Sequence, residues 1–229
     1  MNGKLRGNIA IDGPAGAGKS TVARLLAHKL KYQYIDTGAM YRALTWKAVQ
    51  RGIDFDDEQQ LTALARSTKI FIDNNKDEEP VIYCDGEDIT TAIRSPQISR
   101  LVSSVAQKAG VRYYLVKLQR RMAVSNRVVM DGRDIGTYVL PDAPYKYYLT
   151  ASLDERARRR RSELAVNGWL PDMEKIKEEI YRRDTQDSQR QITPMKPAKD
   201  AIIIDTSNMN IEAVVARLLY LIKKQGGLK

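Results

Sequence analysis

The chain has 229 residues, of which 43% are hydrophobic and 29% charged, and its formal net charge is +10. This composition supports a domain with a buried core and disfavours a disordered chain. No apolar run approaches the roughly 18–20 residues that span a bilayer, and we expect no secretory signal. One cysteine and one histidine exclude an internal disulfide and a Cys/His metal cluster. We therefore expect a cytoplasmic protein without a membrane partner.

The excess of positive charge indicates either simple solubility or a polyanionic partner, which is a nucleic acid or a phosphorylated small molecule. Arginines recur in short clusters beside glycine, aspartate and tyrosine. Such clusters favour discrete phosphate sites over a continuous nucleic-acid stripe, so we expect no nucleic-acid partner.

In chain order, the first part of the sequence alternates short apolar runs with amphipathic segments. These predict strands at 8–12 and 32–36 and helices at 18–31 and at 39–50, and a short helix that follows Asp56 and Asp57 and runs through Arg66. The pattern then changes, because 69–73 and 80–84 alternate with period two around a polar loop, as in a hairpin. We interpret residues 66–95 as a small inserted β-rich lobe.

The rest of the chain returns to the first pattern. It predicts helices at 96–107, 110–125, 152–166, 172–189 and 210–224, and strands at 127–131, 145–149 and 201–205. The first two of these helices are expected to break at Gly110. Apolar strands that alternate with helices predict an α/β fold, a parallel sheet covered on both faces. We expect a single domain over residues 1–229, with its core in about 1–65, 96–150 and 195–229.

The segment NIAIDGPAGAGKST, residues 8–21, fits the pattern G-x-x-x-x-G-K-[ST]. An apolar strand precedes this segment and a helix follows it, as a phosphate-binding P-loop requires. Glycine permits backbone conformations in which N–H groups approach an anion closely, and the helix N-terminus adds partial positive charge. We expect Lys19 to reach the nucleotide phosphates and Ser20 to ligate Mg²⁺. The sequence thus predicts a P-loop NTPase-type sheet.

Two further motifs follow predicted strands, DTGAMYR at 36–42 and DGRD at 131–134. Ligands of open α/β sheets bind beyond the carboxyl ends of the strands. Both motifs deliver an arginine there, Arg42 and Arg133, and arginine forks suit phosphate. Each alone fits a surface ion pair, but together they favour a second phosphate site.

Two arginine-rich helical segments complete the candidate site. In RARRRRSEL, Arg156, Arg159, Arg160 and Glu163 share one helical face, which predicts a helical lid over about 155–171 that closes on a transferring phosphoryl group. A solvated face and a nucleic-acid patch are the alternatives. In RRDTQDSQR, the predicted helix places Arg183, Asp187 and Arg190 on one face. They fit either a structural ion pair or a site for a sugar and a phosphate.

At these motifs the chain resembles bacterial cytidylate kinases, the CMP/dCMP kinases of the nucleoside monophosphate kinase group. The resemblance runs from about Ile9 to the last helix and includes IDGPAGAGKST, DTGAMYR, DGRDIGT, VLPDAP and RRDTQDSQR. It also includes the β-rich insertion, which in this family belongs to the monophosphate-binding lobe. The motifs are specific in combination, whereas the P-loop alone indicates only nucleotide binding.

The resemblance implies a role for each matching position. ATP phosphates and Mg²⁺ are implied to contact Gly13, Pro14, Ala15, Gly16, Ala17, Gly18, Lys19, Ser20 and Thr21, with Ser20 on the metal. The CMP phosphate is implied to contact Thr37, Arg42, Arg133 and Arg190, the cytosine Ser103, Arg112 and Asp134, and the sugar Arg183 and Asp187. Thr37, often serine in the family, keeps the hydroxyl. We expect Lys19, Arg133, Arg156 and Arg160 to act on the transferred group.

The implied reaction converts ATP and CMP or dCMP to ADP and CDP or dCDP. A carboxylate such as Asp134 suits cytosine, whose exocyclic N4 donates, and disfavours uracil, which presents an acceptor there. A kinase for UMP or another metabolite and a nucleic-acid-binding ATPase remain as alternatives. We expect a monomer.

Overall fold

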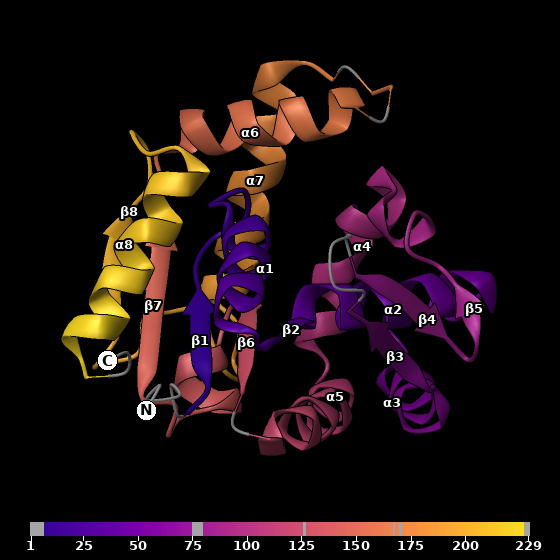
Figure 1. The fold of residues 1–229 in the computed structure, drawn as a ribbon. Helices are drawn as coiled ribbons and strands as arrows, with labels where there is room; N and C mark the ends of the chain where they lie inside the picture. The colour runs from indigo at the N-terminus through magenta and orange to yellow at the C-terminus, as the bar shows by residue number, and fades with distance from the viewer. Residues whose placement is uncertain (1–6, 75–79, 126, 167, 170, 227–229) are drawn as a thin grey trace. The chain divides into compact units, whose positions relative to one another are not determined.

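The structure is a computed structural model that describes residues 7–74, 80–125, 127–166, 168–169 and 171–226. The chain divides into two compact units. We call them the sheet unit, Met1–Tyr34 with Ser125–Lys229, and the hairpin unit, Ile35–Val124. Figure 1 shows the elements of both units.

A five-stranded sheet with the order β2-β6-β1-β7-β8 forms the base of the sheet unit, except that Ile35 and Asp36, the last two residues of β2, are counted in the hairpin unit. Its strands are β1 (Ile9–Asp12), β2 (Gln33–Asp36), β6 (Val128–Gly132), β7 (Tyr145–Thr150) and β8 (Ile202–Asp205). The central strand β1 pairs in parallel with β6 and β7, and β7 pairs in parallel with β8. The predicted parallel sheet is confirmed, and the carboxyl ends of these strands meet at one edge.

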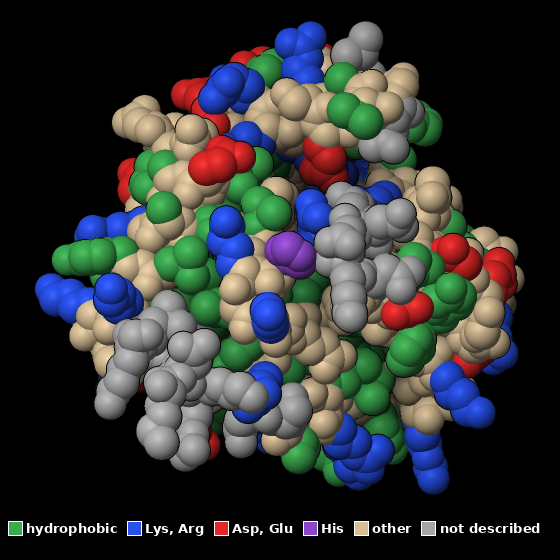
Figure 2. All heavy atoms as spheres, viewed as in Figure 1, with side chains coloured by type: hydrophobic (Ala, Val, Ile, Leu, Met, Phe, Trp, Pro, Cys, Tyr) green, Lys and Arg blue, Asp and Glu red, His purple; other side chains and the backbone are tan. Residues whose placement is uncertain are grey.

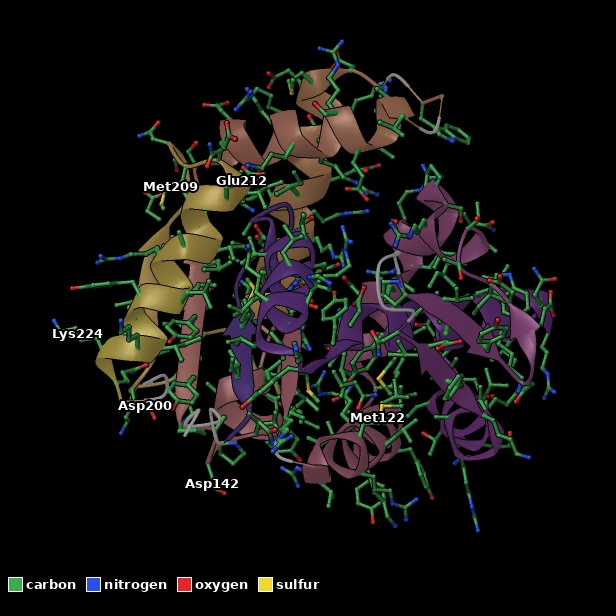
Figure 3. The ribbon with its side chains drawn as sticks, viewed as in Figure 1. Met122, Asp142, Asp200, Met209, Glu212 and Lys224 are labelled. Atoms are coloured by element: carbon green, nitrogen blue, oxygen red, sulfur yellow. The ribbon has the colours of Figure 1, made fainter. Side chains whose placement is uncertain are left out.

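Helices α1 (Lys19–Leu30) and α8 (Ile211–Lys224) lie over the same face of this sheet (Figure 1). Val22 and Leu26 of α1 and Leu218 of α8 pack with Ile9 and other strand residues in one apolar core. Glu212 lies in the first turn of α8 and Lys224 at its other end (Figure 3), the arrangement that the helix dipole favours.

Helices α6 (Leu153–Val166) and α7 (Met173–Ser188) pack against each other, and α6 lies beyond the carboxyl end of β7 (Figure 1). A π-helical turn, η3 (Ile135–Val139), follows β6. In the described part of the chain, no helix combines the length and apolarity that crossing a membrane requires.

The hairpin unit combines helices with a three-stranded sheet of order β3-β4-β5. Its elements are α2 (Thr37–Gln50), α3 (Glu58–Ser67), β3 (Ile70–Asp73), β4 (Val81–Cys84), β5 (Glu87–Asp88), η1 (Ala92–Arg94), α4 (Pro96–Gln107) and α5 (Ala109–Met122), with η2 (Ala123–Ser125) at its end. Antiparallel pairing of β3 with β4 confirms the predicted hairpin, whose loop residues 75–79 lie outside the described residues. The unit extends well beyond the expected lobe at 66–95, whose boundaries stay a prediction.

Two predicted helix boundaries in this unit are corrected. The break between α4 and α5 falls at Lys108, which ends one helix and begins the next, and not at Gly110. Gly110 instead lies in the first turn of α5, where an added Cβ would come within 2.1 Å of Thr62 Oγ1 on α3. Helix α2 begins at Thr37, two residues before the predicted start, because the Asp36 carboxylate accepts a hydrogen bond from the Ala39 N–H and caps it.

Candidate active site

The segment between β1 and α1, residues 13–18, has the strand–loop–helix context that the sequence predicts for a phosphate-binding loop. We call it the phosphate loop. Gly13, Gly16 and Gly18 have φ angles of 145°, 75° and 82°, which other residues rarely adopt. The loop therefore leads from the buried end of the central strand directly to the N-terminus of a twelve-residue helix, where anions are stabilised.

Lys19 is the first residue of α1, and its ammonium group is buried beside the loop. Its Nζ donates a hydrogen bond of 2.6 Å to the Pro14 carbonyl oxygen. Burial, together with the nearby Arg133, holds the pKa of Lys19 well below its ordinary value, and Asp131 opposes this shift. An anion placed next to this ammonium would relieve both effects, so the site is arranged to receive one.

Ser20 and Asp131 form a candidate Mg²⁺ site. The Ser20 hydroxyl donates to Asp131 Oδ2 at 3.0 Å, and the Tyr34 hydroxyl donates to Oδ1 at 2.8 Å. A hydroxyl, a carboxylate and substrate phosphates are the oxygen ligands that Mg²⁺ takes in such sites, so these residues fit the metal. Asp131 was missed among the candidate residues, although an apolar strand that ends in a carboxylate beside the P-loop strand signals it.

Asp187 joins two of the predicted phosphate-binding arginines. Its Oδ2 accepts from Arg133 Nε at 2.9 Å and its Oδ1 from Arg190 at 2.8 Å. Burial alone would raise the pKa of Asp187, but the positive charges of Arg133, Arg183 and Arg190 hold this pKa below its ordinary value. Buried Arg190 Nε has no hydrogen-bond partner among the described residues. The cluster thus keeps donor capacity that a phosphate could take.

The expected helical face of Arg183, Asp187 and Arg190 needs one correction. Helix α7 ends at Ser188, so Arg190 lies beyond the helix and reaches Asp187 from the following segment. Arg183 lies on α7 itself and contributes to lowering the pKa of both Lys19 and Asp187. The structure therefore brings all three residues together, with Arg133 as an additional partner.

Asp134 is buried directly after β6, at the start of η3. The next two N–H groups, of Ile135 and Gly136, donate at 2.7 and 2.8 Å to the carboxylate of Asp12, the last residue of β1. Asp12 thereby fixes the segment that carries Asp134 to the strand that enters the phosphate loop.

We expect Asp12 to make folding less favourable as pH rises. Burial raises its pKa from 3.8 to about 7, against the two N–H groups, and Asp134 adds to the shift. The folded protein then binds a proton between pH 4 and 7 that the unfolded chain releases, so stability present at low pH is lost as pH rises through 7, on the order of 4 kcal/mol in total. Urea unfolding from pH 4 to 8 should show this slope flattened in Asp12→Asn and retained in the exposed control Asp142→Asn. Parallel curves for Asp12→Asn and the unmodified protein would contradict it.

The predicted lid arginines do not act alike. Arg156 donates to the Ala15 carbonyl oxygen at 3.0 Å and pairs with Asp184. Arg159 donates to the Ala17 carbonyl oxygen of the phosphate loop at 3.4 Å and to the Thr206 carbonyl oxygen at 2.6 Å. Arg160 pairs instead with Glu163 on its own helix, at 2.9 Å. The expected common face of these side chains is thus divided between contacts to the phosphate loop and contacts within α6.

The hairpin unit holds the remaining candidate residues. Asp36, which caps α2, accepts from Arg42 at 3.0 Å, and buried Arg42 Nε has no hydrogen-bond partner among the described residues. Thr37 and Ser103 are buried. Arg112 is buried over the Tyr41 ring at 5.6 Å and donates to the Ala106 carbonyl oxygen at 3.2 Å. Thr37 and Arg42 belong to α2, Ser103 to α4 and Arg112 to α5.

The parallel sheet with a glycine-rich loop, a buried lysine and a Ser–Asp pair defines the chain as a protein of the P-loop kinase fold. A solved structure of shikimate kinase from Acinetobacter baumannii in complex with shikimate supports this fold, with a TM-score of 0.50, 16% identity and coverage of 96% of this chain and 95% of that one. More particularly, the profile of the cytidylate kinase family matches residues 9–224, and the chain belongs to this family.

Curated relatives agree with the family assignment. The chain is 53% identical to a cytidylate kinase from Pelotomaculum thermopropionicum over 93% of its own length and 94% of the relative's. It is 49% identical to a cytidylate kinase from Geobacillus sp. (strain WCH70) over 97% and 100%. It is also 50% identical to a bifunctional pantoate ligase/cytidylate kinase from Synechococcus sp. (strain JA-3-3Ab), over 96% of this chain but only 42% of that protein. The chain therefore spans about two fifths of that relative.

Proposed function

We propose that the protein transfers the γ-phosphoryl group of ATP to CMP or dCMP, giving ADP and CDP or dCDP. The observation that carries this proposal is the closeness of two cationic groups within the sheet unit. Lys19, directly after the phosphate loop, lies near enough to Arg133 for the arginine to lower its pKa, and Arg133 donates a hydrogen bond to Asp187 of the Asp187–Arg190 pair. One group suits the donor phosphates and the other the acceptor phosphate. The relatives named cytidylate kinase support the choice of acceptor.

Phosphoryl transfer between two nucleotides needs alignment and charge neutralisation more than acid–base chemistry. The acceptor is a phosphate oxygen with a second pKa near 6, so it is largely deprotonated at neutral pH and needs no general base. Lys19 and Arg133 would neutralise charge on the phosphates as they approach. Ser20 and Asp131 would hold Mg²⁺, which when bound would supply positive charge against the phosphates. Closure of α6 and the segment after it, residues 155–171, would exclude water.

The remaining candidate residues would select the acceptor. Thr37, Arg42 and Arg190 would hold its phosphate, and Arg183 and Asp187 its sugar. Asp187 can still accept from a hydroxyl, because a carboxylate has about four lone-pair positions and two are used here. Ser103, Arg112 and Asp134 would read the cytosine, with Asp134 accepting from N4.

The nucleic-acid alternative would need a continuous basic surface. On the face drawn in Figure 2, the coloured Lys and Arg side chains are scattered among acidic and apolar ones and form no continuous stripe. A monomeric, cytoplasmic enzyme without nucleic-acid or membrane partners remains our prediction.

An acceptor panel tests the function. ADP release should be measured with CMP, dCMP, UMP, AMP and shikimate. We expect turnover of CMP and dCMP, with kcat/KM for UMP lower by roughly 5- to 150-fold, because uracil leaves a buried carboxylate facing an oxygen. In Asp134→Asn the side-chain amide can donate to uracil, so the preference for CMP over UMP should narrow. Equal turnover of UMP and CMP by the unmodified protein would contradict the assignment of cytosine nucleotides as acceptors. ATP hydrolysis that is stimulated by DNA or RNA in the absence of a nucleotide acceptor would contradict the proposed kinase activity.

A further inference from the structure

One peptide unit of the phosphate loop is bonded at both of its polar ends. The carbonyl oxygen of Pro14 accepts from Lys19 Nζ at 2.6 Å, and the N–H of the same peptide, on Ala15, donates to Asp184 Oδ1 at 2.9 Å. Asp184 is separated from Ala15 by 169 residues and lies on α7. The plane of the peptide on which Lys19 rests is therefore set by a carboxylate from a distant helix.

The other oxygen of this carboxylate connects α7 to α6. Asp184 Oδ2 accepts from an amino group of Arg156, and the same Arg156 nitrogen donates to the Ala15 carbonyl oxygen at 3.0 Å. Arg156 Nε donates to the Ala151 carbonyl oxygen at 3.1 Å, which fixes the guanidinium plane. Both polar groups of Ala15 are thus held by one ion pair.

Apolar packing joins the same three segments. Ala15 belongs to a small buried cluster with Ala157 of α6 and Ile176 and Ile180 of α7. The backbones also approach closely, because a Cβ added to Gly16 would lie 2.9 Å from the Arg156 carbonyl oxygen. The phosphate loop and the base of the helix pair therefore form one packed body.

We propose that Asp184 is a positioning residue of the ATP site, which holds the Pro14–Ala15 peptide, and with it Lys19, in the orientation that receives the ATP phosphates. The proposal rests on the proposed function in that it takes the bound nucleotide to be ATP. Asp184 acts through the loop and Arg156, and it leaves the phosphates to Lys19 and the loop N–H groups. A preorganised site spends less of the binding energy on ordering itself. Loss of the Asp184 contacts to Ala15 and Arg156, which we call the Asp184 brace, should therefore weaken ATP binding.

Asp184 shares its side of α7 with Asp187. Asp187 lies three residues later, on the same side of the helix, and holds Arg133 and Arg190. One turn of α7 therefore fixes the phosphate loop through one carboxylate and the candidate acceptor arginines through the next. A change at Asp184 should affect the ATP side of the reaction first, since Asp187 keeps its own partners.

The role of Asp184 can be tested by titrating the protein with a non-hydrolysable ATP analogue and Mg²⁺, in the absence of any acceptor. We expect Asp184→Ala to raise the Kd about 10- to 100-fold, as for a lost charge-assisted hydrogen bond. Asp184→Asn should lie between, because its amide oxygen still accepts from the Ala15 N–H. The matched control Glu178→Ala, an exposed carboxylate on the same helix, should stay within about 2-fold of the unmodified protein. In turnover assays of Asp184→Ala, KM for ATP should rise, while KM for CMP should stay within about 3-fold of its value in the unmodified protein.

The outcomes separate positioning from folding and from the function itself. Circular dichroism and thermal unfolding establish the folded fraction of each variant, and if Asp184→Ala does not fold, Asp184→Asn carries the test. An unchanged Kd in the folded variants, or a rise in KM for CMP alone, overturns the proposal. Should the unmodified protein bind the analogue and fail to phosphorylate CMP, the proposed reaction falls, and the titration still decides the role of Asp184.

Discussion

Lys19→Met should lower kcat for phosphoryl transfer on the order of 10³-fold, as when a preorganised group that stabilises transition-state charge is removed, and should at the same time raise the melting temperature of the nucleotide-free protein. The two effects have one cause. Burial and Arg133 hold the pKa of Lys19 well below its ordinary value. A charged lysine with a lowered pKa costs folding free energy at neutral pH, and removing the charge removes that cost. Methionine keeps the apolar stem of the side chain.

Steady-state kinetics with ATP and CMP, and thermal unfolding without nucleotide, check both halves of this prediction. Lys29→Met is the matched control, because Lys29 is an exposed lysine in the last turn of the same helix. Its kcat should stay within about 2-fold, in line with surface substitutions. A Lys19→Met protein that loses activity and melting temperature together would show that the lysine mainly supports the loop through its bond to Pro14, contrary to this account.

Most of the fold could be predicted because its signals are local. Continuous apolar runs such as 128–130 and 202–204 become strands of a parallel sheet, and the change to period-two alternation marks the β3–β4 hairpin. What the local pattern misplaced was set by packing. Gly110 looks like a helix breaker, but it is the residue that lets α5 approach Thr62 on α3, and the chain breaks at Lys108 instead.

The candidate site divides in the same way. The phosphate loop follows from its motif, since glycine spacing, lysine and flanking elements are all local. Asp131 and Asp184 were missed as site residues because their roles come from partners more than 100 positions away, Ser20 at 111 and Ala15 at 169. Helical spacing also cannot tell which arginine of a run faces inward. The spacing treats Arg156 and Arg160 alike, whereas in the structure Arg156 donates to the Ala15 carbonyl oxygen of the loop and Arg160 pairs with Glu163.

The buried cations around Arg133 are offset locally by carboxylates, although the sheet unit as a whole keeps an excess of Lys and Arg over Asp and Glu. Arg133 is the clearest case. Although burial lowers it, the pKa of Arg133 is raised above its ordinary value by Asp187 and Asp184. In the proposed reaction, substrate phosphates would add further negative charge beside these carboxylates. Phosphates would therefore share the arginines with Asp187, and the arginines would be held in place before the substrates arrive.

Arg133→Ala should lower kcat on the order of 10³-fold, since an arginine on a transferring phosphoryl group contributes 10³–10⁵ in rate. Its Nε donates to Asp187 and its Nη1 donates to the Gly132 carbonyl oxygen at 3.4 Å, so the side chain is anchored beside the candidate phosphate site. Arg133→Lys keeps the charge but loses the fork, so it should recover only part of the rate. Stability should fall by about 1–3 kcal/mol, because Asp187 loses one charged partner and keeps Arg190.

Kinetics with saturating ATP and varied CMP, together with urea unfolding, separate the catalytic effect of Arg133 from its structural one. Arg127→Ala is the matched control, because Arg127 is exposed and precedes the same strand at its opposite end. A purely structural arginine predicts lower stability with kcat unchanged per folded molecule. An arginine on the acceptor phosphate predicts lower kcat and higher KM for CMP even where the variant is fully folded. We expect the second result, because Arg133 interacts with both groups. It lies close enough to Lys19 to lower the pKa of the lysine, and it forms an ion pair with Asp187.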